Sequence, residues 1–170
     1  MKGIYIFLKC CFDFFDDSEK KCFFYTALYL EDSDIQKDNL LDNWAAEELP
    51  NTIDDAEETR ANGREVLHYL KMHSLLEENE PQQCFRIHKL IHLAALYSLS
   101  TDGGQGILVK FGEALDKPVD VECWKNKRWI SLVDRKMSAL PAKLICPKLS
   151  TLFLQKNPNW NLFQKHSLFI

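Results

Sequence analysis

Hydrophobic positions recur with helical spacing through much of the first hundred residues. Residues 5–29 are dense in aromatic side chains, and the later part of this stretch predicts a helix. Its predicted N-cap is Asp17 or Ser18, and it runs to about Leu30. Apolar residues cover more than one side of this helix, so we expect it to lie at the centre of the first domain.

Two further helices are predicted downstream. Ser33 and Gln36 have the spacing of a capping box, which predicts a helix that starts at Ser33 and ends near Pro50. A third helix is predicted from Asp54, although Gly63 near its middle costs about 1 kcal/mol relative to alanine.

Strand-like patterns follow the third helix. Residues 74–77 predict a short strand, residues 78–82 a polar turn and residues 84–87 a second strand. His88 lies where this strand meets a helix predicted to run to Ser100, and the free N–H groups of a helix start favour an anionic ligand. Three helices followed by a hairpin is the element order of a winged helix, a fold that does not specify a function by itself.

The second part of the chain has a different pattern. The glycine-rich stretch 101–106 predicts a flexible linker and lacks the Gly-Lys-Ser/Thr ending of a phosphate loop. Residues 149–157 fit L-x-x-L-x-L-x-x-N, the leucine-rich repeat signature, and Ile130-Ser131-Leu132 precedes Leu152-Phe153-Leu154 by 22 residues, within the usual repeat period. The sequence therefore predicts an α+β chain.

Its expected domains are a mainly helical winged helix at residues 1–100, a linker at 101–127 and the first one or two leucine-rich repeats at 128–170. Charge also divides the chain. Residues 1–80 contain 19 acidic and 8 basic side chains, a net charge of −11, and residues 81–170 contain 6 and 13, a net charge of +7. This contrast fits two modules that face each other, partners of opposite charge, or two unrelated solvated surfaces.

The acidic first domain argues against DNA binding, which depends on phosphate neutralisation by lysine and arginine. The six cysteines include no C-x-x-C pair and predict free, buried thiols in a reducing compartment. Cys84, His88 and His92 have a spacing seen in zinc sites, but without a fourth ligand, a packed cysteine and a surface His92 fit better. The apolar run near the start is too short for a signal core and no stretch reaches membrane-spanning length, so we expect a cytoplasmic protein.

Four blocks in order resemble the middle of plant NB-ARC leucine-rich-repeat disease resistance proteins. Residues 22–32 resemble the family's C-F-L-Y-C-A-L-F-P-E-D block, and residues 40–47 its L-I-x-x-W-I-A-E helix. Residues 87–89 occupy the position of the Met-His-Asp motif, and residues 128–132 resemble the R-R-I-S-L entry into the repeats.

The resemblance implies that residues 1–100 form the winged-helix end of the NB-ARC nucleotide switch. It also implies that His88 is the motif histidine, which reaches the β-phosphate of ADP and helps to hold the closed state. Lys89 stands where the family has aspartate, which changes the local charge by two units. The sequence contains neither a phosphate loop nor an acidic metal-binding strand. We therefore expect no catalysis and no metal, and ADP or ATP only in the context of a full-length receptor.

The partners implied are the nucleotide-binding (NB) domain of a longer receptor, a leucine-rich repeat domain, and pathogen effectors or guarded host proteins. A gene fragment and a functional truncated product are both consistent with the sequence. Two alternative functions are a truncated adaptor that modulates full-length receptors and a winged-helix DNA-binding module.

Overall fold

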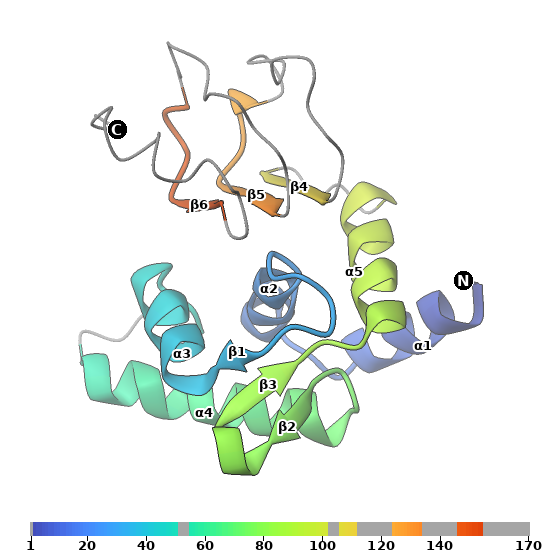
Figure 1. Cartoon of the computed structure of the whole chain (residues 1–170), viewed down its shortest axis with the longest axis vertical. Helices are drawn as coiled ribbons and strands as arrows, with labels where there is room; N and C mark the ends of the chain where they lie inside the picture. The colour runs from blue at the N-terminus through green and yellow to red at the C-terminus, as the bar shows by residue number, and fades with distance from the viewer. Residues whose placement is uncertain (1, 51–54, 102–105, 112–123, 134–145, 155–170) are drawn as a thin grey trace. The chain divides into compact units, whose positions relative to one another are not determined.

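The computed structural model describes residues 2–50, 55–101, 106–111, 124–133 and 146–154 of the 170-residue chain (Figure 1). The chain divides into two compact units, Met1–Gly103 and Gly104–Ile170. The described part of the first unit combines helices with a small antiparallel sheet, and that of the second contains a parallel sheet. None of the helices described has the length and apolar content needed to cross a bilayer.

The first unit begins with two helices, α1 (Lys2–Phe12) and α2 (Asp17–Thr26). Asp16 caps α2, since its carboxylate accepts a hydrogen bond from the Glu19 N–H and the Glu19 carboxylate accepts one from the Asp16 N–H. The predicted cap at Asp17 or Ser18 was wrong because Glu19 completes a capping box only with Asp16. The predicted end near Leu30 was also wrong, because the chain leaves the helix at Ala27 and continues as a buried turn.

Helices α3 (Lys37–Ala46) and α4 (Ala56–Met72) pack against each other. Gly63 of α4 is buried at their contact, and a Cβ on this residue would lie 2.7 Å from Cδ2 of Leu41. The capping box predicted at Ser33 is absent, because the Ser33 hydroxyl donates to the Leu30 carbonyl oxygen. The next residues instead form a strand, so α3 starts at Lys37.

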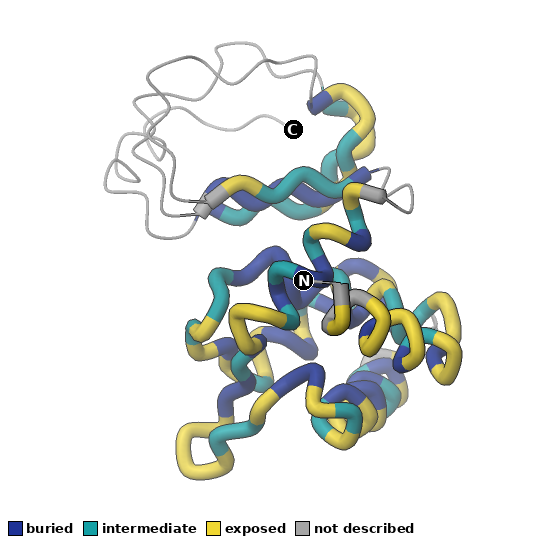
Figure 2. Tube along the Cα trace, turned by 90° about the vertical axis from the view of Figure 1, so that its right-hand side faces the viewer, coloured by how far each residue is buried: buried dark blue, intermediate teal, exposed yellow. Residues whose placement is uncertain are grey.

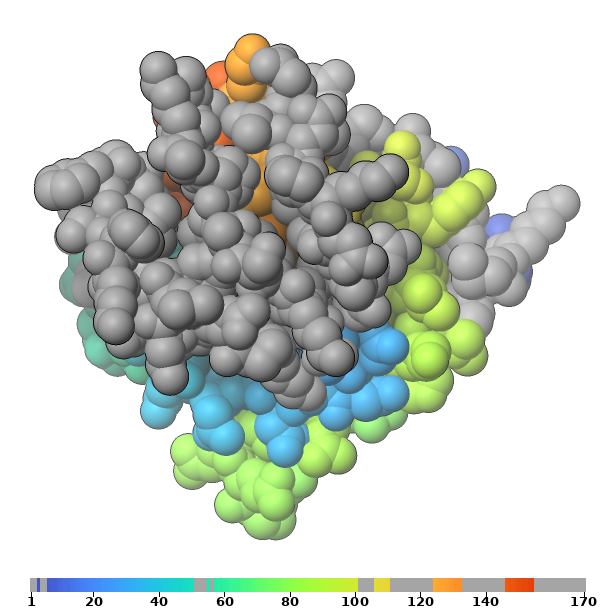
Figure 3. Space-filling model, turned by 45° about the horizontal axis from the view of Figure 1, so that its top comes forward, coloured from blue at the N-terminus to red at the C-terminus, as the bar shows by residue number. Residues whose placement is uncertain are grey.

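The sheet of the first unit has three antiparallel strands in the order β1-β3-β2. Strand β1 is Ile35–Gln36, β2 is Glu77–Asn79 and β3 is Cys84–Arg86, with Phe85 opposite both Ile35 and Glu78. The turn from β2 to β3 contains the 3₁₀ helix η1 (Glu80–Gln82) and projects from this unit (Figures 1 and 3).

The strand predicted at residues 74–77 was placed too early. The N–H groups of Leu75 and Leu76 both donate to the Leu70 carbonyl oxygen, so these residues close the end of α4 instead of entering the sheet. Both leucines are buried, whereas in an alternating strand two consecutive side chains would point to opposite faces. The strand predicted at 84–87 is confirmed as β3.

Helix α5 (Lys89–Thr101) packs against α1 and confirms the helix predicted to reach Ser100. Its buried face includes Ala94 and Ala95, whereas Leu90 and Tyr97 are exposed. The helix therefore has more apolar side chains than its packing in this unit buries. Figure 2 shows the buried positions of this unit in dark blue. The large side chains buried there include Phe23, Tyr25, Leu28, Ile35, Leu40, Trp44, Leu67 and Leu70.

The described residues of the second unit form three parallel strands, β4 (Ile107–Phe111), β5 (Trp129–Val133) and β6 (Thr151–Phe153). Leu108 pairs with Ile130, and Ile130 pairs with Leu152, so each step across the sheet is 22 residues along the chain. The 22-residue spacing seen in the sequence therefore equals the separation along the chain of residues that pair between neighbouring strands. Trp124, Ile130, Leu132 and Leu154 form its core.

Strand β4 lies within the segment assigned to the linker. The intervening repeat residues 134–145 and the motif's final positions, 155–157, lie outside the described residues. Trp44 in the first unit and Trp129 in the second are both buried.

Candidate functional site at the start of helix α5

His88 lies at the junction of β3 and α5, as the sequence predicted, and its side chain is exposed. The backbone N–H of Leu90 donates to Nδ1 of the imidazole over 3.2 Å, and the His88 carbonyl oxygen accepts the N–H of His92 over 2.9 Å. His88 therefore caps the helix with its own ring. Because Nδ1 acts as the acceptor, the neutral ring carries its proton on Nε2, where it is a hydrogen-bond donor.

The first turn of α5 presents further features that favour an anion. His88, Lys89 and Leu90 are all exposed, and they lie at the positive end of the helix dipole. The Lys89 ammonium lies 3.8 Å from the Glu31 carboxylate, so its charge is partly balanced by a neighbour in the loop after α2. A donor N–H, a cation and a helix start thus occupy one exposed turn.

The strand that leads to His88 is fixed by a polar cluster with Asp34 at its centre. Nε of Arg86 donates to Asp34 Oδ1 over 2.6 Å, and the Cys84 thiol donates to the same oxygen over 3.2 Å. The bond from Arg86 holds the pKa of Asp34 below its ordinary value, whereas burial, followed by the bond to Asp34, raises the pKa of the Cys84 thiol. These contacts connect β3 to the residue before β1.

His92 is fully buried, so the prediction of a surface residue was wrong. Its Nε2 lies 3.0 Å from the carbonyl oxygen of Ala27 at the end of α2, and Nδ1 lies 3.5 Å from Oε2 of Glu31. The imidazole tolerates burial because the end of α2 offers it an acceptor. Burial lowers the pKa of His92.

The structure does not bring Cys84, His88 and His92 together as a ligand set. Cys84 bonds to Asp34, His88 to its own helix and His92 to Ala27. Within the described ranges, no group of three or more histidine, cysteine, aspartate or glutamate side chains has an arrangement that could hold a metal ion.

The predicted free thiols are confirmed at the five described positions, while Cys123 lies outside them. Three of these thiols are buried, at Cys11, Cys22 and Cys84. Cys10 is exposed and Cys146 is half-buried, so the expectation of burial fails at these two positions.

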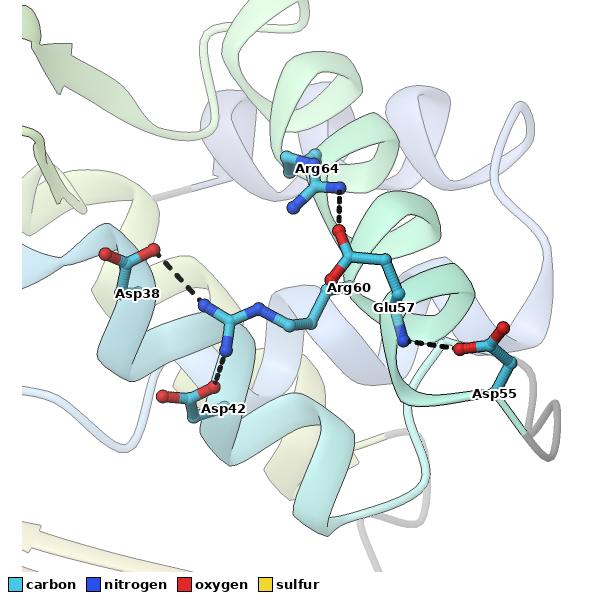
Figure 4. A network of polar contacts seen from close by, with 6 residues as sticks. All are labelled: Asp38, Asp42, Asp55, Glu57, Arg60 and Arg64. Carbon is cyan, nitrogen blue, oxygen red and sulfur yellow. Dashed lines mark hydrogen bonds and ion pairs between the residues drawn. The ribbon is translucent and has the colours of Figure 1, made fainter.

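Exposed acidic side chains of α3 form ion pairs with an arginine of α4. The guanidinium of Arg60 lies between Asp42, on one side, and Asp38, 3.3 Å away on the other (Figure 4). A second pair on α4 joins Arg64 to Glu57 over 3.3 Å. The ion pairs of Arg60 thus join α3 to α4 at an exposed position.

Comparison with known proteins finds a match for part of these elements. Residues 28–94 match the winged helix domain of disease resistance proteins. The matched span contains α3, α4, all three strands of the first sheet and the first turns of α5, including His88.

Relatives over a longer span are disease resistance proteins of Arabidopsis thaliana. One putative disease resistance protein is 34% identical to this chain over 158 residues, which is 91% of this chain and 18% of that protein. Disease resistance protein SUMM2 is 30% identical over 161 residues, 92% of this chain and 18% of that protein. Disease resistance protein RPS5 is 33% identical over 141 residues, 81% of this chain and 16% of that protein. The chain thus spans less than a fifth of the length of these relatives.

Local sequence patterns predicted the position of His88 between β3 and α5 but not the contacts between Glu31 and His92 nearby. Glu31 and His92 are 61 residues apart in the sequence and meet only when α5 packs beside the end of α2. Four-residue spacing places His92 one turn after His88, but this spacing alone does not show which face of the helix is buried.

Proposed function

We propose that this chain is the winged-helix and repeat-entry segment of a plant immune receptor, in which the winged helix regulates an ADP/ATP switch. The match of residues 28–94 to the winged helix domain of disease resistance proteins supports this proposal. So do the relatives, which resemble the chain across both of its units. In this role the chain is regulatory, and a longer receptor supplies the phosphate loop.

The proposal rests mainly on the exposure and orientation of the His88 side chain. Its ring is exposed, is oriented by the Leu90 N–H, and carries its proton on Nε2 when neutral. In the proposed receptor this N–H donates to a phosphate oxygen of ADP and stabilises the resting state. Lys89, in place of the family's aspartate, adds a cation beside the same phosphate.

The second unit supports the proposed repeat entry. Parallel strands at a constant step of 22 residues, with Ile130 and Leu132 turned into one core, have the geometry that stacked leucine-rich repeats require. Such repeats bury their apolar faces only against further repeats, so we propose that a longer leucine-rich repeat domain is the partner of this unit.

A receptor chimera tests the role of His88. Residues 1–100 would replace the corresponding segment of RPS5, and the release of bound ADP would be followed with a fluorescent analogue. Loss of one hydrogen bond to a charged group costs about 1.5–3 kcal/mol, so His88→Ala should accelerate release by roughly 10- to 100-fold.

His68→Ala is the matched control, because His68 is an exposed histidine on α4 outside the site, and it should leave release unchanged. Equal ADP release from the His88→Ala and unsubstituted chimeras would reject the proposed role.

A further inference from the structure

One buried side chain connects the candidate site to the centre of the first unit. The imidazole of His92 is held at the end of α2 by the Ala27 carbonyl oxygen, 3.0 Å from Nε2, and faces Glu31 through Nδ1 at 3.5 Å. His92 also donates its backbone N–H to the His88 carbonyl oxygen. The contact therefore lies one helical turn from the residue that caps α5.

The number of protons on the ring determines what this contact can do. A carbonyl oxygen only accepts hydrogen bonds, so the neutral ring keeps its single proton on Nε2 for Ala27. The position for a second proton is Nδ1, on the side of the Glu31 carboxylate. His92 can therefore gain a positive charge only at Nδ1, inside the packed contact.

The charged groups around His92 come from two elements. Glu31 and Asp32, in the loop after α2, favour the protonated ring, as does a hydrogen bond with the Tyr29 backbone. Lys89, on α5, lies beside Glu31 and weakens its effect. Helix α1, which also packs on α5, buries Cys11 and leaves Lys9 exposed.

Burial outweighs these favourable charges, because it is the largest influence and lowers the pKa of His92. The ring is therefore neutral near pH 7. Protonation in acid is costly while the ring stays buried, and it favours conformations in which the ring reaches water.

We propose that His92 is a proton-operated latch that fastens the first turns of α5 to the Ala27 carbonyl oxygen at the end of α2 and releases them on acidification, with the Glu31 carboxylate opposing release. Since these turns carry His88, release would change the position of the residue that contacts the anion. This consequence for a nucleotide rests on the function proposed above, whereas the latch itself does not.

A proton NMR titration of the imidazole Cε1–H signals in the full chain tests the latch directly, with His92 assigned by its loss in His92→Gln. We expect His92 to titrate below 6.5, the ordinary histidine value. Glu31→Gln should lower the titration point further, because it removes a carboxylate that favours the charged ring. Lys89→Met should raise it, because it leaves Glu31 unopposed. Titration of His92 at or above 6.5, or no shift in Glu31→Gln, would overturn the proposal.

Urea unfolding from pH 7.5 to 5.5 tests the consequence for stability. A histidine with a lowered folded pKa contributes its full stability above about pH 6.5 and loses it as the pH falls towards the folded pKa. The unfolding constant should therefore rise by up to about tenfold per pH unit below 6.5 in the unsubstituted chain. Asp34 and Glu78, whose pKa values are also lowered, titrate below this window.

His92→Gln keeps an N–H for Ala27 but does not titrate, so its unfolding constant should vary less with pH. His68→Gln, at an exposed histidine of α4 outside the contact, is the matched control and should keep the full dependence. The same pH dependence in both variants would contradict the latch. If His92→Gln does not fold, the NMR titrations of Glu31→Gln and Lys89→Met decide. The His92 signal is then the one whose titration point shifts in opposite directions in these two variants. Neither experiment uses a nucleotide, so failure of the His88→Ala chimera test would reject the proposed function without affecting the latch.

Discussion

Gly63 shows how a single residue that weakens a helix can be required by packing. In isolation it disfavours α4, but in the structure it is buried where α4 crosses α3. A Cβ at this position would lie 2.7 Å from Leu41 Cδ2 and 3.7 Å from Cε3 of Trp44. Both of these neighbours are themselves buried in the core, so neither can move aside easily.

Gly63→Ala should therefore destabilise the chain, although alanine is the better helix former. Overpacking costs about 1–3 kcal/mol, and the gain in helix propensity offsets about 1 kcal/mol. We expect a net loss of about 1 kcal/mol in the free energy of unfolding, measured by urea titration at pH 7. Leu41→Ala removes the atom that is contacted, so the double variant should lose less than the sum of the two single losses. Strict additivity would contradict the close contact.

Two of the elements were predicted correctly from a local signal. Strand β3 and helix α5 follow from the alternation and the helical spacing on either side of His88. Strand β1 was missed because its two residues are a strand only through pairing with Cys84 and Phe85, some 50 residues later. Strand β2 was placed too early because Leu75 and Leu76 cap α4, and no local pattern separates a buried cap from a short buried strand.

One side chain of strand β2, that of Glu78, contacts two helices. The Glu78 carboxylate accepts a hydrogen bond from Lys71, at the end of α4, over 2.6 Å and lies 3.8 Å from Lys37, at the start of α3. The hydrogen bond from Lys71 lowers the pKa of Glu78. Its neighbour Glu77 is exposed on the same strand.

Glu78→Gln should lower the free energy of unfolding at pH 7 by about 1 kcal/mol, whereas Glu77→Gln should have little effect. Because the folded pKa of Glu78 is lowered, its contribution is present above about pH 4.5 and is lost as the pH falls through the folded pKa. The difference between Glu78→Gln and the unsubstituted chain should therefore shrink in acid. Urea unfolding at pH 7 and pH 3.5 measures this, and a difference that persists unchanged at pH 3.5 would contradict the ionic origin.

Across the chain, two units of different construction follow each other, and the sequence pattern also changes between them. A helical period with a terminal hairpin indicated the first unit, and a 22-residue step between apolar triplets indicated the second. The candidate site was only partly predictable. His88 is marked by its place at a strand-to-helix junction, but Glu31 and His92 depend on tertiary packing and leave no local pattern.

We propose that the exposed histidine at the start of α5 contacts a nucleotide phosphate when the rest of a receptor is present. The most direct measurement is a crystal structure of the RPS5 chimera with ADP bound. We expect Nε2 of His88 to lie within about 2.7–3.2 Å of a phosphate oxygen while Nδ1 still accepts the Leu90 N–H. An ADP phosphate held by other residues, with the His88 ring beyond hydrogen-bond distance, would contradict it.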